Sequence, residues 1–178
     1  MPPSNISTSV TLLAIISADG YISKGQGVPW ELPDEKAHFR AYAAGKWCLL
    51  GRRTYEEMLG WFRDHHPLVL TTRENGPPLP LGQRVRSVGE AVALASAAAQ
   101  PELVVLGGGA AYEAAMPWAD RLEITHVDQI LGGGITFPAI SPRDWEPVRR
   151  LAHPIDERHA QAFEIVSYRR AARLPVAA

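Results

Sequence analysis

The segment LVVLGGGAAYEAAM, residues 103–116, decides the fold of this chain more clearly than any other stretch. Its first four residues, Leu103 to Leu106, form an apolar run typical of a strand that is buried on both faces. Gly107, Gly108 and Gly109 follow directly, and the Ala-rich residues after them favour a helix as far as Met116. A buried strand that passes through glycines into a helix predicts a strand–helix unit of an α/β protein.

Strand and helix signals alternate on both sides of this unit. Apolar runs predict buried strands at residues 10–17 and 47–51. Further strands are expected at 68–72 and 121–127, and closing strands, which could pair antiparallel, at 145–151 and 163–168. Helices are expected from Pro33, from a Thr54 cap to Leu59, and over residues 88–99. This alternation predicts an α/β fold whose sheet is mostly parallel and flanked by helices.

Length and composition indicate one globular domain. Of the 178 residues, 46% are hydrophobic and 21% are charged. We expect the domain at residues 10–170, with flexible segments at 1–9 and 171–178. The net charge of −1 argues against a broad nucleic-acid surface. No apolar run approaches the ~18 residues of a membrane span, and the start lacks a secretion pattern, so we expect a cytoplasmic protein, more readily a monomer than a dimer.

Metal and disulfide chemistry are not expected from the sequence. Cys48 is the only cysteine, which excludes an internal disulfide and a cysteine-rich metal site. It lies in an apolar run, which favours a buried and inert thiol. His38, His153 and His159 are expected to be exposed, and the spacing of the histidines does not indicate a metal site.

Ligands of such sheets bind at the carboxyl ends of the strands, and unusual residues gather there. The glycines at 107–109 allow a close backbone approach, and the helix after them offers free N–H groups to a phosphate. The same run also suits a tight turn without a ligand. Arg52 and Arg53 follow another strand, and Thr72 and Arg73 follow a third. Three arginines and a hydroxyl fit a ribose 2′-phosphate and favour NADPH over NADH, although each pair alone also suits a solvated charge cluster.

The segment VPWELPDE, residues 28–35, places a carboxylate one turn into a helix. Phe39 lies four residues after Glu35, so both side chains point to one side of that helix. A carboxylate beside an aromatic ring is partly desolvated, and desolvation raises its pKa. Such a group can bind an amidine-like heterocycle and help to deliver a proton. The alternative is an ordinary acid in the first helical turn, which the helix dipole favours.

The order of these motifs resembles the dihydrofolate reductase family. The motifs are D-G-x-I, PW-x-LP-x-E-x-x-x-F, GR-x-T, T-T, GGG-x-x-Y, T-H-V-D and F-P, and they extend over residues 10–169. The resemblance implies an eight-stranded sheet and NADPH-dependent reduction of 7,8-dihydrofolate to 5,6,7,8-tetrahydrofolate, a step of one-carbon metabolism. It also implies a cis peptide between Gly107 and Gly108, and a loop at residues 22–28 that closes over the nicotinamide.

The resemblance also implies a role for individual residues. Glu35 takes the place of the pterin-binding acid, Thr125 hydrogen-bonds it directly, and Trp30 helps to fix it through water; these three form the expected catalytic set. The expected substrate contacts are Leu13, Ile15, Glu35, Phe39, Met58, Phe62, Leu106 and Tyr112. The expected NADPH contacts are Ala14, Ile22, Gly51, Arg52, Arg53, Thr54, Leu70, Thr71, Thr72, Arg73, Gly107, Gly108, Gly109 and Ala110.

The chain departs from the family pattern around the substrate. An arginine that pairs with the glutamate tail of folate is usual before the third strand, and His65 stands there instead. Arg63 or Lys36 could supply the missing charge, and Ile15 is bulkier than the usual residue. Two alternatives therefore stay open: a same-fold NADPH reductase acting on another pteridine or on a ribosylamino-pyrimidine of riboflavin synthesis, and a catalytically idle NADPH-binding protein. The riboflavin enzymes typically lack the PW-x-LP-x-E segment.

Overall fold

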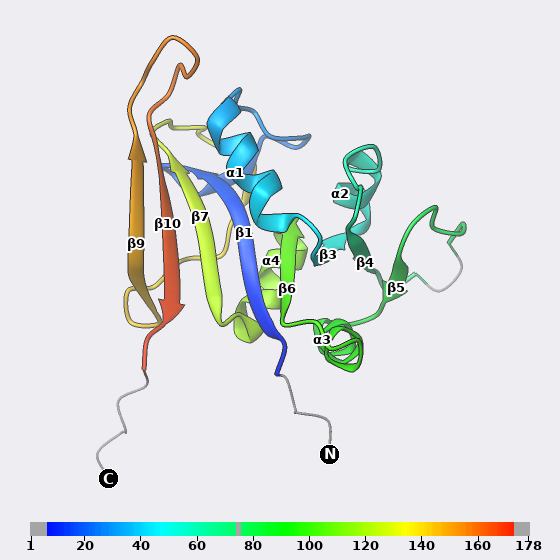
Figure 1. The fold of residues 1–178 in the computed structure, drawn as a ribbon. Helices are drawn as coiled ribbons and strands as arrows, with labels where there is room; N and C mark the ends of the chain where they lie inside the picture. Colours follow the sequence, from blue (N-terminus) through cyan, green and yellow to red (C-terminus); the bar gives the residue numbers. More distant parts are fainter. Residues whose placement is uncertain (1–6, 74–75, 173–178) are drawn as a thin grey trace.

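A single eight-stranded sheet forms the centre of the structure, a computed structural model that describes residues 7–73 and 76–172 (Figure 1). The strand order is β5-β4-β3-β6-β1-β7-β10-β9. β10 runs antiparallel to both of its neighbours, and the other pairs in the sheet are parallel. The expected fold class is therefore confirmed. The expected flexible ends lie largely outside the described residues.

The elements follow one another with short connections. The strands are β1 Ser9–Ser17, β2 Tyr21–Ser23, β3 Trp47–Gly51, β4 His66–Leu70, β5 Gln83–Val85, β6 Glu102–Gly107, β7 Arg121–Val127, β8 Ile135–Thr136, β9 Trp145–His153 and β10 Phe163–Arg170. The helices are α1 Pro33–Ala43, α2 Arg52–Glu57, α3 Val88–Ala97 and α4 Gly109–Ala115, with the 3-10 turn η1 at Met116–Trp118. β2 and β8 pair antiparallel in a small separate sheet.

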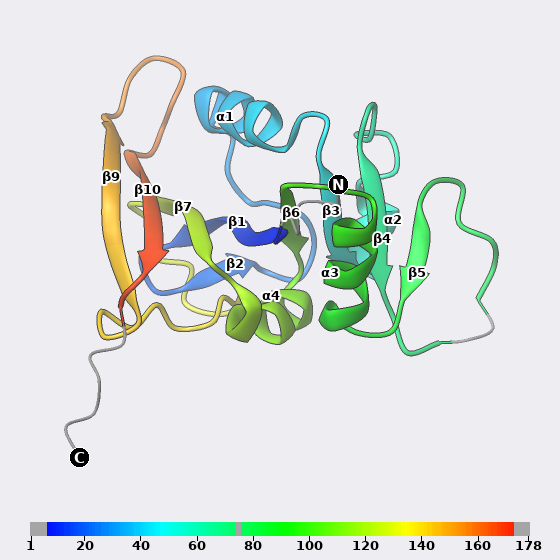
Figure 2. The same ribbon diagram turned by 60° about the horizontal axis from the view of Figure 1, so that its bottom comes forward.

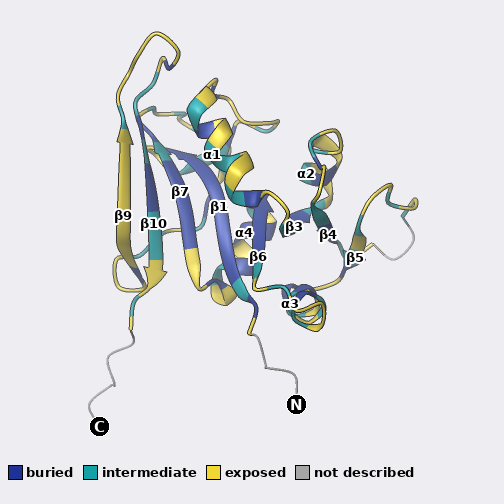
Figure 3. Cartoon of the chain, viewed as in Figure 1, coloured by how far each residue is buried: buried dark blue, intermediate teal, exposed yellow. Residues whose placement is uncertain are grey.

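Alternating side chains of the central strands pack into two separate hydrophobic cores. Leu12, Ala14 and Ile16 of β1 belong to the core under α3 and α4, whereas Leu13 belongs to the core under α1 and α2. The helices accordingly cover opposite faces of the sheet (Figure 2). The central strands are buried, while β9 at the edge is largely exposed (Figure 3). Within the described residues, no helix has the length and apolar character needed to cross a bilayer.

Two local predictions are wrong. The strand predicted at 68–72 is β4, which runs from His66 to Leu70 because its pairing partner β3 ends at Gly51, opposite Leu70. Thr54 does not cap α2. The helix starts at Arg52, immediately after β3, so Gly51 is the cap position and Thr54 lies inside the first turn.

Other boundaries differ by a few residues. α3 starts at Val88 as predicted, where the Ser87 side chain accepts a hydrogen bond from the Glu90 N–H, but it ends at Ala97 and Ala99 takes a positive φ of 52°. Strands β2, β5 and β8 were not predicted, since two or three residues are too few for a periodic signal.

Candidate active site

A cleft of about 760 Å³ opens at the carboxyl ends of β1, β3 and β6. One wall comes from α1, another from α2, and the floor comes from the β6–α4 turn. Most of the expected site residues line it: Ile15, Ile22, Trp30, Glu35, Phe39, Gly51, Arg52, Arg53, Thr54, Met58, Leu70, Leu106, Gly107, Gly108, Gly109, Ala110 and Tyr112. Segments far apart in the sequence thus meet at one edge of the sheet, as the rule for open α/β sheets predicts.

Glu35 is the buried acid of this cleft. Pro33 occupies the first turn of α1, and the carboxylate follows on the face that turns toward the sheet. Glu35 is only 7% exposed, and the Thr125 hydroxyl of β7 donates a hydrogen bond to its Oε1 at 3.3 Å. Burial raises the pKa of Glu35 above its ordinary value, against the opposing effects of the Thr125 bond and of the charges on His38 and Lys36. The carboxyl group therefore keeps its proton to a higher pH than an exposed glutamate.

Trp30 lies beside the acid but has a different partner from the expected one. Its indole N–H donates to the side-chain oxygen of Gln129 at 2.7 Å. A link from Trp30 to the acid through water, which the resemblance implied, stays a prediction. The ring is 6% exposed and packs with Ile15 and Leu32, so it serves as an apolar wall of the cleft. Gln129 was not foreseen from the sequence.

Tyr112 fixes the floor of the cleft. Its hydroxyl donates to the Leu13 carbonyl at 2.7 Å and thereby ties α4 to β1. Burial, together with the charge of Glu35, raises the pKa of Tyr112 well above its ordinary value, so the phenol stays protonated. Phe39 meets the Trp61 ring edge-on at 5.9 Å on the opposite side. Glu35 therefore lies among aromatic side chains, and Lys36 and Arg40 of α1 add two positive charges to the lining of the cleft.

Several expected residues do not line the cleft. The Leu13 and Ala14 side chains point into the two cores, because successive residues of β1 alternate between the faces of the sheet. Phe62 packs against Tyr55 and Trp61 beneath the surface. Thr71, Thr72 and Arg73 lie beyond the end of β4, where the Thr71 hydroxyl accepts from the Arg73 N–H at 3.2 Å. Thr125 reaches the site only through its bond to Glu35.

The glycines at the strand ends fit a phosphate-bearing cofactor. A Cβ built at Gly51 would lie 3.8 Å from the backbone nitrogen of Gly108, so the ends of β3 and β6 approach each other without side chains between them. The implied cis peptide between Gly107 and Gly108 is present, and Gly107 has a φ of 117°. Arg52 and Arg53 border the same part of the cleft. Arg52 Nη1 pairs with Glu56 Oε1 at 2.6 Å, an exposed ion pair that a phosphate can displace. Bare backbone and two guanidinium groups at one part of the cleft suit the phosphates of NADPH.

The three cations considered for the substrate tail are placed very differently. The His65 side chain is 6% exposed and lies 4.3 Å from the Trp61 ring, and burial lowers its pKa, which favours the neutral ring. The Arg63 guanidinium donates to the carbonyls of Gly60 and Phe62 at 2.9 and 3.1 Å. Lys36 lines the cleft, together with Arg40 one turn further along α1. Arg40 was missed, although it follows Lys36 by four residues and therefore lies on the same side of α1 as that lysine.

The fold and the cleft define an oxidoreductase that uses a nicotinamide dinucleotide. Beyond this class, a family model for dihydrofolate reductase matches residues 9–170. The chain belongs to the dihydrofolate reductase family.

Curated relatives agree with that assignment. The chain is 32% identical over 161 residues to the type 3 dihydrofolate reductase of Salmonella typhimurium, an alignment that covers 90% of this chain and 98% of that protein. It is 35% identical over 122 residues to the dihydrofolate reductase of Mycobacterium tuberculosis, covering 68% of this chain and 73% of that one. The Enterococcus faecalis dihydrofolate reductase complexed with NADP(H) and RAB-propyl superposes with a TM-score of 0.82 at 24% identity, covering 94% and 99% of the two chains, and supports the fold.

Proposed function

We propose that this chain reduces 7,8-dihydrofolate to 5,6,7,8-tetrahydrofolate with NADPH, and that Glu35 is the only ionisable side chain that governs the chemistry. The observation that carries this proposal is the buried carboxyl group of Glu35 in an apolar cleft that continues to the glycines at 107–109. NADPH, when bound, supplies the hydride that the pterin C6 accepts. Family membership and the geometry of the cleft support the same reaction.

Glu35 binds the amidine edge of the pterin and favours its protonation. Its two oxygens suit two parallel N–H donors of a flat heterocycle, and Thr125 holds one of those oxygens in place. The proton for N5 comes from water, and the raised pKa of Glu35 keeps a proton available at the site. Phe39, Met58 and Ile15 provide apolar walls for the ring.

The remaining parts of the cleft bind and shield. Gly51 and the glycines at 107–109 would let the cofactor backbone approach closely, while Arg52 and Arg53 would hold its phosphates. The loop at residues 22–28 contributes Gly25 and Gly27, both with positive φ, to the rim of the cleft. Closure of this loop would exclude bulk water from the reacting atoms.

Spectrophotometric loss of NADPH with dihydrofolate tests the proposal. We expect turnover with dihydrofolate and tight binding of methotrexate. A folded sample that binds NADPH but turns over only a ribosylamino-pyrimidine would assign the same-fold alternative, and one without turnover on either substrate would support the idle binding protein.

The proposal also includes a role in folate-dependent one-carbon metabolism, a cytoplasmic location and a monomeric state. Tetrahydrofolate is a carrier of one-carbon units, and the reaction draws on the NADPH and folate of the cytoplasm. The elution volume of the purified chain in size-exclusion chromatography tests whether it is a monomer.

The pH dependence of hydride transfer should follow the Glu35 carboxyl group. Because the pKa of Glu35 is raised, the protonated form persists to higher pH, and the single-turnover rate should fall as the pH rises through that value. Thr125→Val removes a bond that favours the charged form, so the fall should move to higher pH. Stopped-flow measurement over the pH range checks both. If the pH profile of the Thr125→Val variant is the same as that of the native chain, Glu35 is not the group that controls the rate.

Lys36 and Arg40 are expected to bind the anionic tail of the substrate. Replacing both with glutamine should raise the KM for dihydrofolate by about 10-fold or more, the loss of at least one bond to a charged group, with little change in kcat. Arg63→Gln is the matched control, since that guanidinium is already occupied by backbone carbonyls. Steady-state kinetics decides. If Arg63→Gln alone gives the larger rise in KM, the tail binds near Arg63 and not near Lys36 and Arg40.

A further inference from the structure

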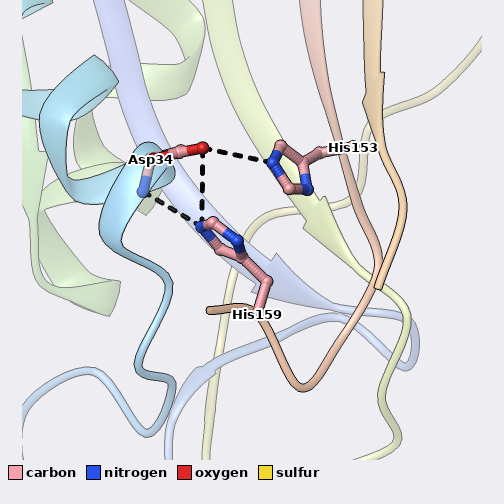
Figure 4. Close-up of side chains that lie close together, drawn as sticks. All are labelled: Asp34, His153 and His159. Atoms are coloured by element: carbon pink, nitrogen blue, oxygen red, sulfur yellow. Dashed lines mark hydrogen bonds and ion pairs between the residues drawn. The ribbon is translucent and has the colours of Figure 1, made fainter. Parts of the chain in front are cut away.

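Two histidines and an aspartate meet outside the cleft, where the β9–β10 connection lies against the start of α1 (Figure 4). Asp34 is in the first turn of α1, His153 ends β9, and His159 lies in the connection between the strands. One ligand atom from each, a carboxylate oxygen and two ring nitrogens, lies within 4.8 Å of the others. We propose that these three side chains bind a divalent transition-metal ion of the zinc class.

The outer nitrogen of each histidine is already engaged by an oxygen atom. His159 Nδ1 is 2.7 Å from the Asp156 Oδ1 carboxylate, and His153 Nδ1 is 2.8 Å from the Pro154 carbonyl. Both oxygens accept hydrogen bonds, so both Nδ1 atoms carry protons. Histidines that bind metals almost always donate their other N–H to a carboxylate or a carbonyl in this way. If both rings are neutral, each Nε2 atom therefore carries a lone pair, and both Nε2 atoms face the interior of the cluster.

Both Nε2 atoms lie near one carboxylate oxygen of Asp34. Asp34 Oδ2 is 3.2 Å from His153 Nε2 and 3.8 Å from His159 Nε2. A lone pair facing a carboxylate is repulsive unless a proton or a metal ion lies between them. A protonated His153 would form ion pairs with Asp34 and with Asp156 Oδ2, which is 3.7 Å from the same nitrogen, and this is the competing interpretation. His159 Nε2 accepts a hydrogen bond from the Asp34 backbone N–H and lies near the same carboxylate oxygen, and two imidazole nitrogens around one carboxylate oxygen favour a shared metal ion.

Two of the three distances between ligand atoms are close to those of tetrahedral coordination. Metal–ligand bonds of about 2.0–2.2 Å at the tetrahedral angle place neighbouring ligand atoms about 3.4 Å apart. The two Asp34 distances of 3.2 and 3.8 Å lie on either side of that value. Arg158 Nη2 pairs with the other oxygen, Oδ1, at 2.9 Å and leaves Oδ2 for the ion. Coordination would replace the hydrogen bond of 3.2 Å that His159 Nε2 accepts from the Asp34 N–H.

The ligand chemistry and the location indicate a structural ion. Two imidazoles with one carboxylate suit zinc and its neighbours in the transition series, whereas magnesium and calcium prefer oxygen ligands. None of the three residues lines the cleft. His159 is fully buried, while the Asp34 side chain is 44% exposed, so an ion could enter from solvent and keep a water as its fourth ligand. The ion would join the connection to the helix that carries Glu35.

Calorimetric titration of metal-free, tag-free protein with Zn²⁺ tests this site. We expect one zinc ion per chain, and a thermal unfolding midpoint that rises with Zn²⁺ but not with Mg²⁺. His153→Asn and Asp34→Asn each remove a ligand and should abolish stoichiometric binding. Asp156→Asn leaves the ligands in place and should weaken binding by about 10- to 100-fold. Glu157→Gln, an exposed acid in the same connection, is the matched control and should bind zinc like the native chain.

Two results would overturn the site. One is the lack of saturable zinc binding by the folded native chain, which would leave the ion pair between His153 and Asp34 as the account of the cluster. The other is unchanged affinity in both His153→Asn and Asp34→Asn, which would place the zinc elsewhere. Zinc X-ray absorption on the native complex should show nitrogen and oxygen ligands at about 2.0–2.2 Å, with two imidazoles. This test does not use reductase activity, so it is independent of the proposed function.

Discussion

Replacing Glu35 with glutamine should lower kcat with dihydrofolate at neutral pH by about 100- to 10,000-fold, the usual contribution of a positioned acid or base. Glutamine keeps the size of the side chain and an oxygen for the Thr125 hydroxyl, so the cleft should keep its shape. It cannot be protonated in this range and cannot pair with the amidine edge as a carboxylate does. Hydride-transfer rates from single turnovers measure the loss directly.

NADPH binding is the internal control for that variant. The acid lies in the substrate half of the cleft, away from Arg52 and Arg53, so the Kd for NADPH should stay within about 3-fold of the native value, less than 1 kcal/mol. A matched surface substitution, Glu113→Gln, should retain full turnover because Glu113 is exposed on α4 and does not line the cleft. Full turnover by Glu35→Gln at neutral pH would refute the mechanism.

Replacing Arg52 and Arg53 together with glutamine should weaken NADPH binding by at least about 100-fold, because two bonds between charged groups are lost at about 1.5–3 kcal/mol each. Both side chains border the cleft beside the glycines at 107–109. NADH lacks the 2′-phosphate, so its affinity should change much less and the preference for NADPH should largely disappear. Fluorescence titration with both dinucleotides gives the two values.

Arg121→Gln is the control for this pair, since Arg121 starts β7 at the opposite end of the sheet. Arg73→Gln is a second comparison variant. The resemblance implies that Arg73 contacts the cofactor, although its side chain does not line the cleft. A further loss of NADPH affinity in Arg73→Gln would support that contact. An equal loss of NADH and NADPH affinity in the Arg52/Arg53 variant would contradict the assignment of the 2′-phosphate.

The parts of this molecule that local patterns determine could be predicted. The strands β3 and β7 were predicted with their observed ends. The apolar run of β3 suits a strand buried on both faces. Pro33 and the acids after it marked the start of α1, and therefore the position of Glu35. The glycine turn after β6 and the carboxyl-edge rule then placed the cleft.

The parts that depend on tertiary contacts could not be predicted. Gln129 lies 99 residues from Trp30 in the sequence, and only the fold brings them into contact. His159 was expected to be exposed, yet the contacts of its ring with Asp156 and Phe163 leave it fully buried. His153 is partly buried because it stacks on Phe163. A histidine carries no sequence signal that separates a solvated ring from one held inside a cluster.

The central claim is tested most directly by the titration of the Glu35 carboxyl group. Carbon NMR on protein with labelled glutamate follows this titration, and the Glu35→Gln variant identifies the resonance. We predict a midpoint above the ordinary value of 4.5 that coincides with the fall of the single-turnover rate. A midpoint at or below 4.5, or a rate that falls at a pH unrelated to it, would contradict the account.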